Sequence, residues 1–161
     1  MKEITLEDNT VTDYEMLARQ AAELTETEPW YIAVMSNVSA LLMDSLDKLN
    51  WAGFYLIRDG FLVVGPFQGK PACIRIPVGK GVCGTAVRED RIQVVPNVHE
   101  FPGHIACDSA SESEIVIPIH HEGQIKAVLD IDSVVRDRFS ERDAAGLAGI
   151  VRVMEEKISW D

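Results

Sequence analysis

A strand–turn–strand pattern at residues 51–65 narrows the range of folds open to this chain more than any other segment. Residues 51–57 are apolar and aromatic, Asp59-Gly60 has the composition of a tight hairpin turn, and residues 61–65 form an apolar return. A second pattern of this kind covers residues 114–120 and 124–133, around a turn at 121–123. Two hairpins predict a mainly antiparallel sheet.

Helical periodicity flanks these hairpins on both sides. Residues 11–25 carry apolar side chains at three- and four-residue intervals, which is typical of an amphipathic helix. The acids and the proline of residues 25–29 predict the start of a second helix, from about Trp30 to Leu49. Its expected core stripe is Val34, Val38, Leu41, Leu42, Ser45, Leu46 and Leu49.

The C-terminal part of the chain predicts one more helix, after the capping-box variant of residues 140–143. Between the hairpins we expect a strand over Ala72 to Ile76, a glycine-rich loop opening a short helix over 79–88, and a short strand over Ile92 to Val95. The whole order indicates the α+β class, with helices covering one face of the sheet and the long loops gathered on the other.

Length and charge limit the classes of function. The chain has 161 residues, which fits one domain over 1–161, and a formal net charge of −11, which argues against sequence-independent binding of nucleic acid or of an anionic membrane. The segment Met1–Asp8 lacks the apolar core of a secretion signal, and no stretch is long and apolar enough for a membrane span, so we expect a cytoplasmic protein.

The three cysteines Cys73, Cys83 and Cys107 always leave one thiol unpaired, which is unsuited to a secreted disulfide framework. Redox chemistry, metal binding and plain packing remain open. Cys107 lies among small and hydroxylated residues in the long loop 96–113, where a reactive thiol can be held, so we take it as a candidate nucleophile. From the residues alone Cys73 reads as a packed strand residue, while packing and function are evenly balanced for Cys83 and Cys107.

Acidic residues in the second hairpin form a further candidate site. Asp130 and Asp132 alternate with Ile131, so both carboxylates lie on one face of a strand, and Glu114 at the start of the partner strand can join them across the hairpin. Like charges on one face require a cation such as a ligand ammonium, or one raised pKa that makes a proton donor. The alternative is a solvated strand end.

Aromatic residues and histidines each allow two interpretations. Trp51 and Tyr55, four residues apart on one strand, share a face and can wall a pocket, although core packing is the commoner role of such a pair. Zinc would need ligands from the cysteines and from His99, His104, His120 and His121. No two cysteines have the spacing of a zinc knuckle, so we expect no metal and expect the histidines at the surface or in caps.

Several long segments recur in order and together resemble one family. They are Asn50-Trp51-Ala52-Gly53-Phe54-Tyr55, Gly65-Pro66-Phe67-Gln68-Gly69-Lys70-Pro71-Ala72-Cys73, Gly79-Lys80-Gly81-Val82-Cys83-Gly84-Thr85-Ala86, residues 103–116 and Val128-Leu129-Asp130-Ile131-Asp132-Ser133. Over roughly residues 30–155, ahead of which lies the helix expected at 11–25, the chain is similar to the free methionine-(R)-sulfoxide reductases, which are built on a GAF domain.

The resemblance implies a six-stranded GAF sheet and an enzyme that reduces free methionine-(R)-sulfoxide by a thiol mechanism. It places the catalytic cysteine at Cys107 and the two other family cysteines, one of which resolves the intermediate, at Cys73 and Cys83. It assigns substrate binding to Glu114, Asp130, Asp132, Trp51 and Tyr55. It implies thioredoxin as the external reductant, no bound cofactor, and a homodimer as an assembly found often in the family.

Two rival functions come from other classes. One is a stand-alone GAF sensor that binds a small amino acid or a nucleotide and signals without consuming it, although nothing else in the sequence supplies an output domain. The other is a zinc protein. The residues alone leave open whether Cys73 or Cys83 pairs with Cys107, because a disulfide needs alpha carbons within about 7 Å.

Overall fold

The two predicted hairpins form the centre of the sheet in the computed structural model, which describes residues 11–161. The segment Met1–Asp8, in which we expect no secretion signal, lies outside the described residues. The strands are β1 (Leu49–Arg58), β2 (Phe61–Gly69), β3 (Arg75–Pro77), β4 (Gln93–Val95), β5 (Ser113–His121) and β6 (Gln124–Ser133). They form one antiparallel sheet in the order β3-β2-β1-β6-β5-β4, so the α+β prediction is confirmed.

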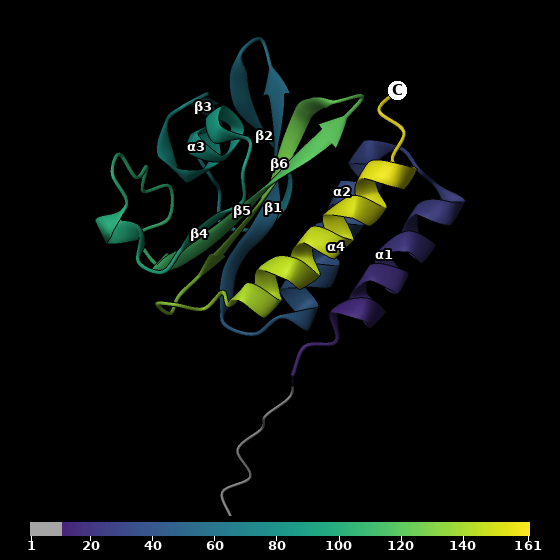
Figure 1. Cartoon of the computed structure of the whole chain (residues 1–161), viewed down its shortest axis with the longest axis horizontal. Coiled ribbons are helices and arrows are strands. Elements are labelled where there is room, and N and C mark those ends of the chain that lie inside the picture. The colour runs from purple at the N-terminus through teal and green to yellow at the C-terminus, as the bar shows by residue number, and fades with distance from the viewer. Residues whose placement is uncertain (1–10) are drawn as a thin grey trace, which may run out of the picture.

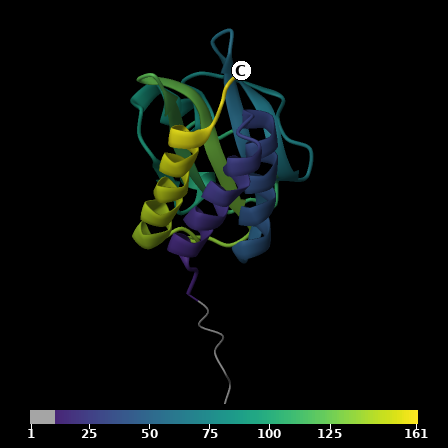
Figure 2. The ribbon, with the colours of Figure 1, turned by 90° about the vertical axis from the view of Figure 1, so that its right-hand side faces the viewer.

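Three helices cover one face of this sheet (Figures 1 and 2). They are α1 (Tyr14–Thr27), α2 (Tyr31–Ser45) and α4 (Glu141–Lys157). Helices α2 and α4 pack on the strands, and α1 packs on α4 and α2 as an outer layer. The alternation of β6 fits this arrangement, because Ile131 is fully buried in the core beneath the helices while its neighbours face the other way.

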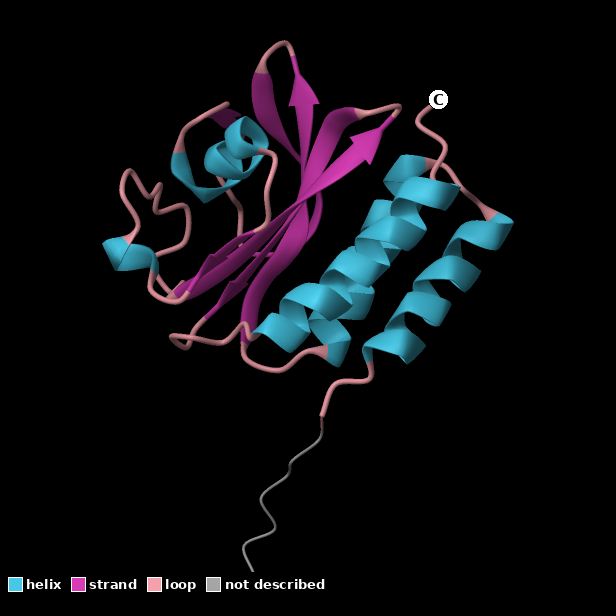
Figure 3. Ribbon diagram, in the orientation of Figure 1, coloured by secondary structure: helices cyan, strands magenta, loops and turns pink. Residues whose placement is uncertain are grey.

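The opposite face carries the short helix α3 (Gly81–Glu89), a 3₁₀ turn at Val98–Glu100 and the loops (Figure 3). A smaller apolar cluster, which includes Trp51, Tyr55, Val116 and Cys83, lies between α3 and the strands. The sheet therefore has one face sealed by long helices and one face that is only partly covered. The predicted gathering of loops on this second face is confirmed.

Helix and strand ends differ from the sequence prediction at three places above all. Strand β2 continues to Gly69, four residues past the predicted 61–65. Helix α2 ends at Ser45 and not near Leu49, because the chain is already extended at Leu46, takes a left-handed conformation at Lys48 (φ 61°) and enters β1 at Leu49. The strand expected over Ala72 to Ile76 is reduced to Arg75–Pro77, and the residues before it form a loop.

The start of α4 follows the predicted capping box. The Ser140 hydroxyl accepts the Asp143 amide hydrogen, and the Asp143 carboxylate accepts the Ser140 amide hydrogen. Asp143 also accepts a 2.6 Å hydrogen bond from the Tyr14 hydroxyl, which ties α1 to α4. Among the described residues, no helix is both long and apolar enough to cross a membrane.

Candidate active site

A disulfide bond joins two loops on the open face of the sheet. Cys73, in the loop between β2 and β3, is bonded to Cys107, in the loop before β5, with 5.4 Å between the two alpha carbons. The sequence left Cys73 and Cys83 open as partners of Cys107, and the packed-strand interpretation of Cys73 is wrong because this residue lies in a loop. Cys83 is free and buried in α3.

Cys107 borders a pocket that lies between the sheet, α3 and the loop 103–111. The pocket encloses about 540 Å³ including its open mouth. Its walls hold every predicted site residue except Cys73; the lining residues are Trp51, Tyr55, Pro71, Ala72, Ile76, Lys80, Gly81, Val82, Cys83, His104, Ile105, Cys107, Asp108, Ser111, Glu114, Asp130 and Asp132. The fold therefore brings nearly all the predicted side chains to one cavity.

The three predicted carboxyl groups meet at the base of this pocket. In the pairing of β5 with β6, Glu114 lies directly opposite Asp132, and Asp130 lies two residues along the same face. Glu114 is only 6% exposed and Asp130 only 5%, while Asp132 is half-buried. The solvated-strand-end alternative is wrong, because the curled sheet and α3 cover these positions.

Burial controls the protonation of this carboxyl cluster. Loss of water raises the pKa of Glu114 and of Asp132 well above the ordinary range, and the neighbouring carboxylates raise both further. Burial also raises the pKa of Asp130, but hydrogen bonds from Glu114 and Cys83 favour its ionised form and oppose that rise. The cluster therefore keeps protons to a higher pH than free carboxyl groups do, and Asp130 is the member whose rise in pKa the hydrogen bonds oppose.

The cluster also has unused hydrogen-bonding capacity. Within the described residues, Oδ1 of Asp130 and Oδ1 of Asp132 are buried without a hydrogen-bond partner. A buried acceptor without a partner costs about 1–3 kcal/mol, so its retention needs a reason such as a donor that arrives with a ligand. Both atoms belong to residues that line the pocket.

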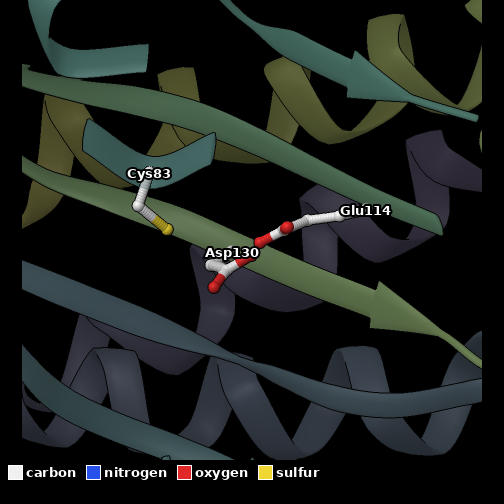
Figure 4. A group of neighbouring side chains, drawn as sticks. All are labelled: Cys83, Glu114 and Asp130. Carbon is white, nitrogen blue, oxygen red and sulfur yellow. The ribbon is translucent and has the colours of Figure 1, made fainter. Parts of the chain in front are cut away.

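Cys83 extends the cluster from the side of α3. Its Sγ and one carboxylate oxygen each of Glu114 and Asp130 lie within 4.8 Å of one another (Figure 4). A thiolate and two carboxylates are donors that could hold a divalent cation. However, burial raises the pKa of Cys83 well above its ordinary value, which favours the neutral thiol over the thiolate that a metal binds.

Trp51 and Tyr55 form one aromatic wall, as their spacing predicts. Their rings stack with centroids 5.9 Å apart, and the Phe67 ring also stacks on Trp51, at 5.1 Å. Both polar atoms reach the loop that carries Cys73: the Tyr55 hydroxyl donates to the Cys73 carbonyl at 2.8 Å, and the Trp51 indole N–H donates to the Lys70 carbonyl at 3.2 Å. This pair thus lines the pocket and also positions the disulfide loop.

His104 is a pocket residue that the sequence did not indicate. Its Nε2 lies 3.9 Å from Oε1 of Glu114, and only 16% of its side chain is exposed. The expectation of a surface or capping role is wrong for this histidine. Burial lowers its pKa, so the ring is neutral at pH 7 and can either donate or accept a hydrogen bond at the pocket.

Asn50 fastens the loop that carries Cys107. Its amide Nδ2 donates to Oδ2 of Asp108 and to Oγ of Ser111, both at 3.0 Å. Asp108 also accepts the Ala110 amide hydrogen at 2.9 Å, and these hydrogen bonds lower the pKa of its carboxyl group. The one sequence signal for this role is that a polar residue stands at the point where the apolar strand begins.

The fold and the site define a GAF domain that carries a disulfide at the mouth of an acidic pocket. The GAF domain family model matches residues 13–156. The free methionine-R-sulfoxide reductase of Escherichia coli strain K12 is 51% identical over 146 residues, which cover 91% of this chain and 88% of the relative.

Two solved structures are similar to this chain in both sequence and fold. The reduced form of fRMsr from Staphylococcus aureus has a TM-score of 0.90 and 54% identity, and the match covers 93% of this chain and 97% of that one. The free methionine-R-sulfoxide reductase from Neisseria meningitidis, solved in complex with its substrate, has a TM-score of 0.86 and 38% identity, over 89% and 87% of the two chains. The chain belongs to the free methionine-R-sulfoxide reductase family.

Proposed function

We propose that this protein reduces free methionine-(R)-sulfoxide to methionine, with Cys107 as the nucleophile and Cys73 as the resolving thiol. The observation that carries the proposal is the Cys73–Cys107 disulfide at a pocket whose base holds three carboxyl groups. Membership in the family makes the chain an oxidoreductase. The particular roles of the residues follow from their chemistry.

The carboxyl cluster explains a preference for the free amino acid. A substrate ammonium among Glu114, Asp130 and Asp132 would supply both the positive charge and the N–H donors that the two unpartnered Oδ1 atoms lack. A methionine sulfoxide residue within a peptide has no free ammonium group, so it cannot offset the burial of these carboxylates. The Trp51–Tyr55 wall would then contact the apolar thioether end.

The chemical step requires a thiolate and a proton donor. The Cys107 thiolate attacks the sulfoxide sulfur and forms a transient sulfur–sulfur bond. The protonated oxygen then moves to the Cys107 sulfur, the substrate's sulfur–oxygen bond and the transient sulfur–sulfur bond both break, and methionine leaves while Cys107 becomes a sulfenic acid. The oxygen needs a proton as it leaves the substrate. A carboxyl group whose pKa is raised by burial, such as Glu114, can donate that proton near pH 7.

Cys73 completes the half-reaction. Its thiol condenses with the Cys107 sulfenic acid, which releases water and forms the disulfide of this structure. Two electrons must then come from an external dithiol, for which we propose thioredoxin, and no bound cofactor takes part. Such a reductant operates in a reducing compartment, in keeping with the cytoplasmic location that we expect.

The test supplies racemic free methionine sulfoxide with dithiothreitol as reductant and follows each epimer. We expect consumption of the R epimer alone, no turnover of N-acetylmethionine sulfoxide, and loss of turnover in Cys107→Ser. Cys83→Ser is the matched control and should keep most of its activity. Absence of R-epimer turnover, or full activity in Cys107→Ser, would contradict the proposal. Tight, reversible ligand binding without consumption by the wild type, or a function that is unchanged when all three cysteines are replaced, would instead support a sensor.

A further inference from the structure

Charge is distributed unevenly around the disulfide. The chain has 26 acidic residues and a net charge of −11, yet residues 60–88 contain no aspartate or glutamate. The same stretch carries four cations, all exposed: Lys70, Arg75, Lys80 and Arg88. This acidic protein therefore has one stretch in which every charged residue is a cation, and the stretch reaches the pocket because Lys80 is one of its lining residues.

Exposed apolar side chains accompany these cations. In residues 70–80, which we call the rim segment, Ile74 is 71% exposed, Val78 is 38% exposed and Pro71 also faces solvent. Arg75 does not extend freely, since its guanidinium carbon lies 3.6 Å from the centroid of the Phe61 ring. Exposed apolar side chains beside cations, one of which is held in place, are typical of a protein-binding surface.

The rim segment also contains one of the two cysteines of the disulfide. Cys73 belongs to this segment and does not line the cavity, whereas Cys107 does. Cys107 is followed directly by Asp108, a half-buried carboxyl group whose pKa is lowered by its hydrogen bonds. Of the two sulfurs, only that of Cys73 therefore lies on the apolar segment that carries the cations.

We propose that the rim segment is the docking surface for an acidic protein dithiol of the thioredoxin type, which attacks the Cys73 sulfur. The proposal rests on the proposed function and adds where the reductant binds and which sulfur it attacks. A thiolate of the reductant attacks Sγ of Cys73 and forms a mixed disulfide, while Cys107 leaves as a thiolate into the pocket and takes up a proton. The second thiol of the reductant then attacks the mixed disulfide, releases the Cys73 thiolate and leaves the reductant oxidised.

Charge also decides among the candidate occupants. Nucleic acid is excluded as a general partner by the net charge of −11. If a second copy of this chain bound through the same surface, the cations around Lys70 and Arg75 of one copy would face the same cations of the other and repel them. The net charge of −11 also repels an acidic protein at long range, so the rim acts in the close encounter, where acidic residues of the partner pair with the cations around Lys70 and Arg75.

The experiment compares two reductants on the same set of variants. Lys70→Glu/Arg75→Glu and Ile74→Asp alter the rim segment, while Arg19→Glu/Arg152→Glu and Met16→Asp make the same changes at exposed positions on the helical face. With thioredoxin, the rim variants should lose about tenfold in kcat/KM for the reductant, which is the usual size of a steering effect. With dithiothreitol all variants should equal the wild type, because a small dithiol needs no docking surface.

The salt dependence of kcat/KM for thioredoxin gives a second test of the docking surface. The loss in the charge-reversed rim variant should shrink as the ionic strength rises, because the screening length falls from about 30 Å at 0.01 M to about 10 Å at 0.1 M. Equal thioredoxin rates in rim and control variants would overturn the docking surface. Failure of the wild type with both reductants would instead overturn the proposed function, so the two failures are distinguishable.

A trapping experiment identifies the sulfur that is attacked. The oxidised wild-type protein is mixed with thioredoxin whose second active-site cysteine is serine, and the mixed disulfide is mapped by mass spectrometry. A link to Cys73 is expected. A link to Cys107 would overturn the assignment, because the reductant would then approach from the acidic loop.

Discussion

Reduction of the Cys73–Cys107 bond should weaken the protein by a predictable amount. The bond closes a loop with a sequence separation of 34 residues. Cross-linking a loop of this length removes chain entropy from the unfolded state that corresponds to about 3.8 kcal/mol at 25 °C. This is an upper value, because residual structure in the reduced, unfolded chain lowers the stabilisation that the disulfide provides.

The assay is urea unfolding of the oxidised and the reduced protein, followed by tryptophan fluorescence. With a slope of about 2 kcal/mol/M, the loss corresponds to a shift of up to about 2 M in the urea midpoint. Free methionine-(R)-sulfoxide added to the reduced protein without any reductant should restore the higher midpoint, because one turnover forms the bond.

Two cysteine variants distinguish the Cys73–Cys107 bond from a Cys83–Cys107 bond. A Cys83–Cys107 bond would close a loop only slightly shorter, so the size of the shift does not identify the partner. Cys73→Ser should unfold at the same urea concentration with and without dithiothreitol, and Cys83→Ala should retain the full difference. A redox-dependent midpoint in Cys73→Ser, or its loss in Cys83→Ala, would refute the assignment of the bond.

Three further predictions concern single positions near the pocket. Glu114→Gln should slow turnover and flatten the pH dependence of stability. Because the pKa of Glu114 is raised, the folded state keeps a proton that the unfolded state releases above about pH 4.5. Wild-type stability therefore falls as pH rises, by up to about 1.4 kcal/mol for each pH unit, until the folded state also releases the proton. Urea midpoints that run parallel in the two proteins from pH 5 to 8 would contradict this. Asn50→Ala removes both 3.0 Å hydrogen bonds to the Cys107 loop and should cost about 1–3 kcal/mol and slow disulfide formation, as stopped-flow fluorescence would measure; an unchanged rate would count against the positioning role. Gly53→Ala would drive a Cβ into that of Phe67, where β1 and β2 approach closely, and should lower stability by at least about 1–3 kcal/mol; a wild-type melting temperature would disprove the close approach.

The two hairpins, the amphipathic helices and the Ser140 capping box could be predicted because each depends on residues close in the chain. The same holds for one part of the site. Asp130 and Asp132 face the same side whatever the rest of the fold does, since side chains alternate along a strand, and Ile131 must then face the helical core.

The residues at which individual helices and strands begin and end were harder to predict. Helix α2 was expected to reach Leu49, because the apolar spacing continues past the point where Lys48 takes a left-handed conformation. Periodicity marks which face of an element is buried and carries little information on where the backbone changes direction. The Ala72 to Ile76 strand was overestimated for the same reason.

The class of fold, the face on which the acidic residues lie and the candidate nucleophile Cys107 could be predicted from the residues and from the resemblance to a family. The bond of Cys107 to Cys73 and not to Cys83, the position of Glu114 opposite Asp132, and the place of His104 and Asn50 in the site depend on the fold. These contacts join residues far apart in the chain, so no local pattern reports them. Strand register and the closure of loops over the sheet set such distances, and burial then raises the pKa values of the carboxyl cluster.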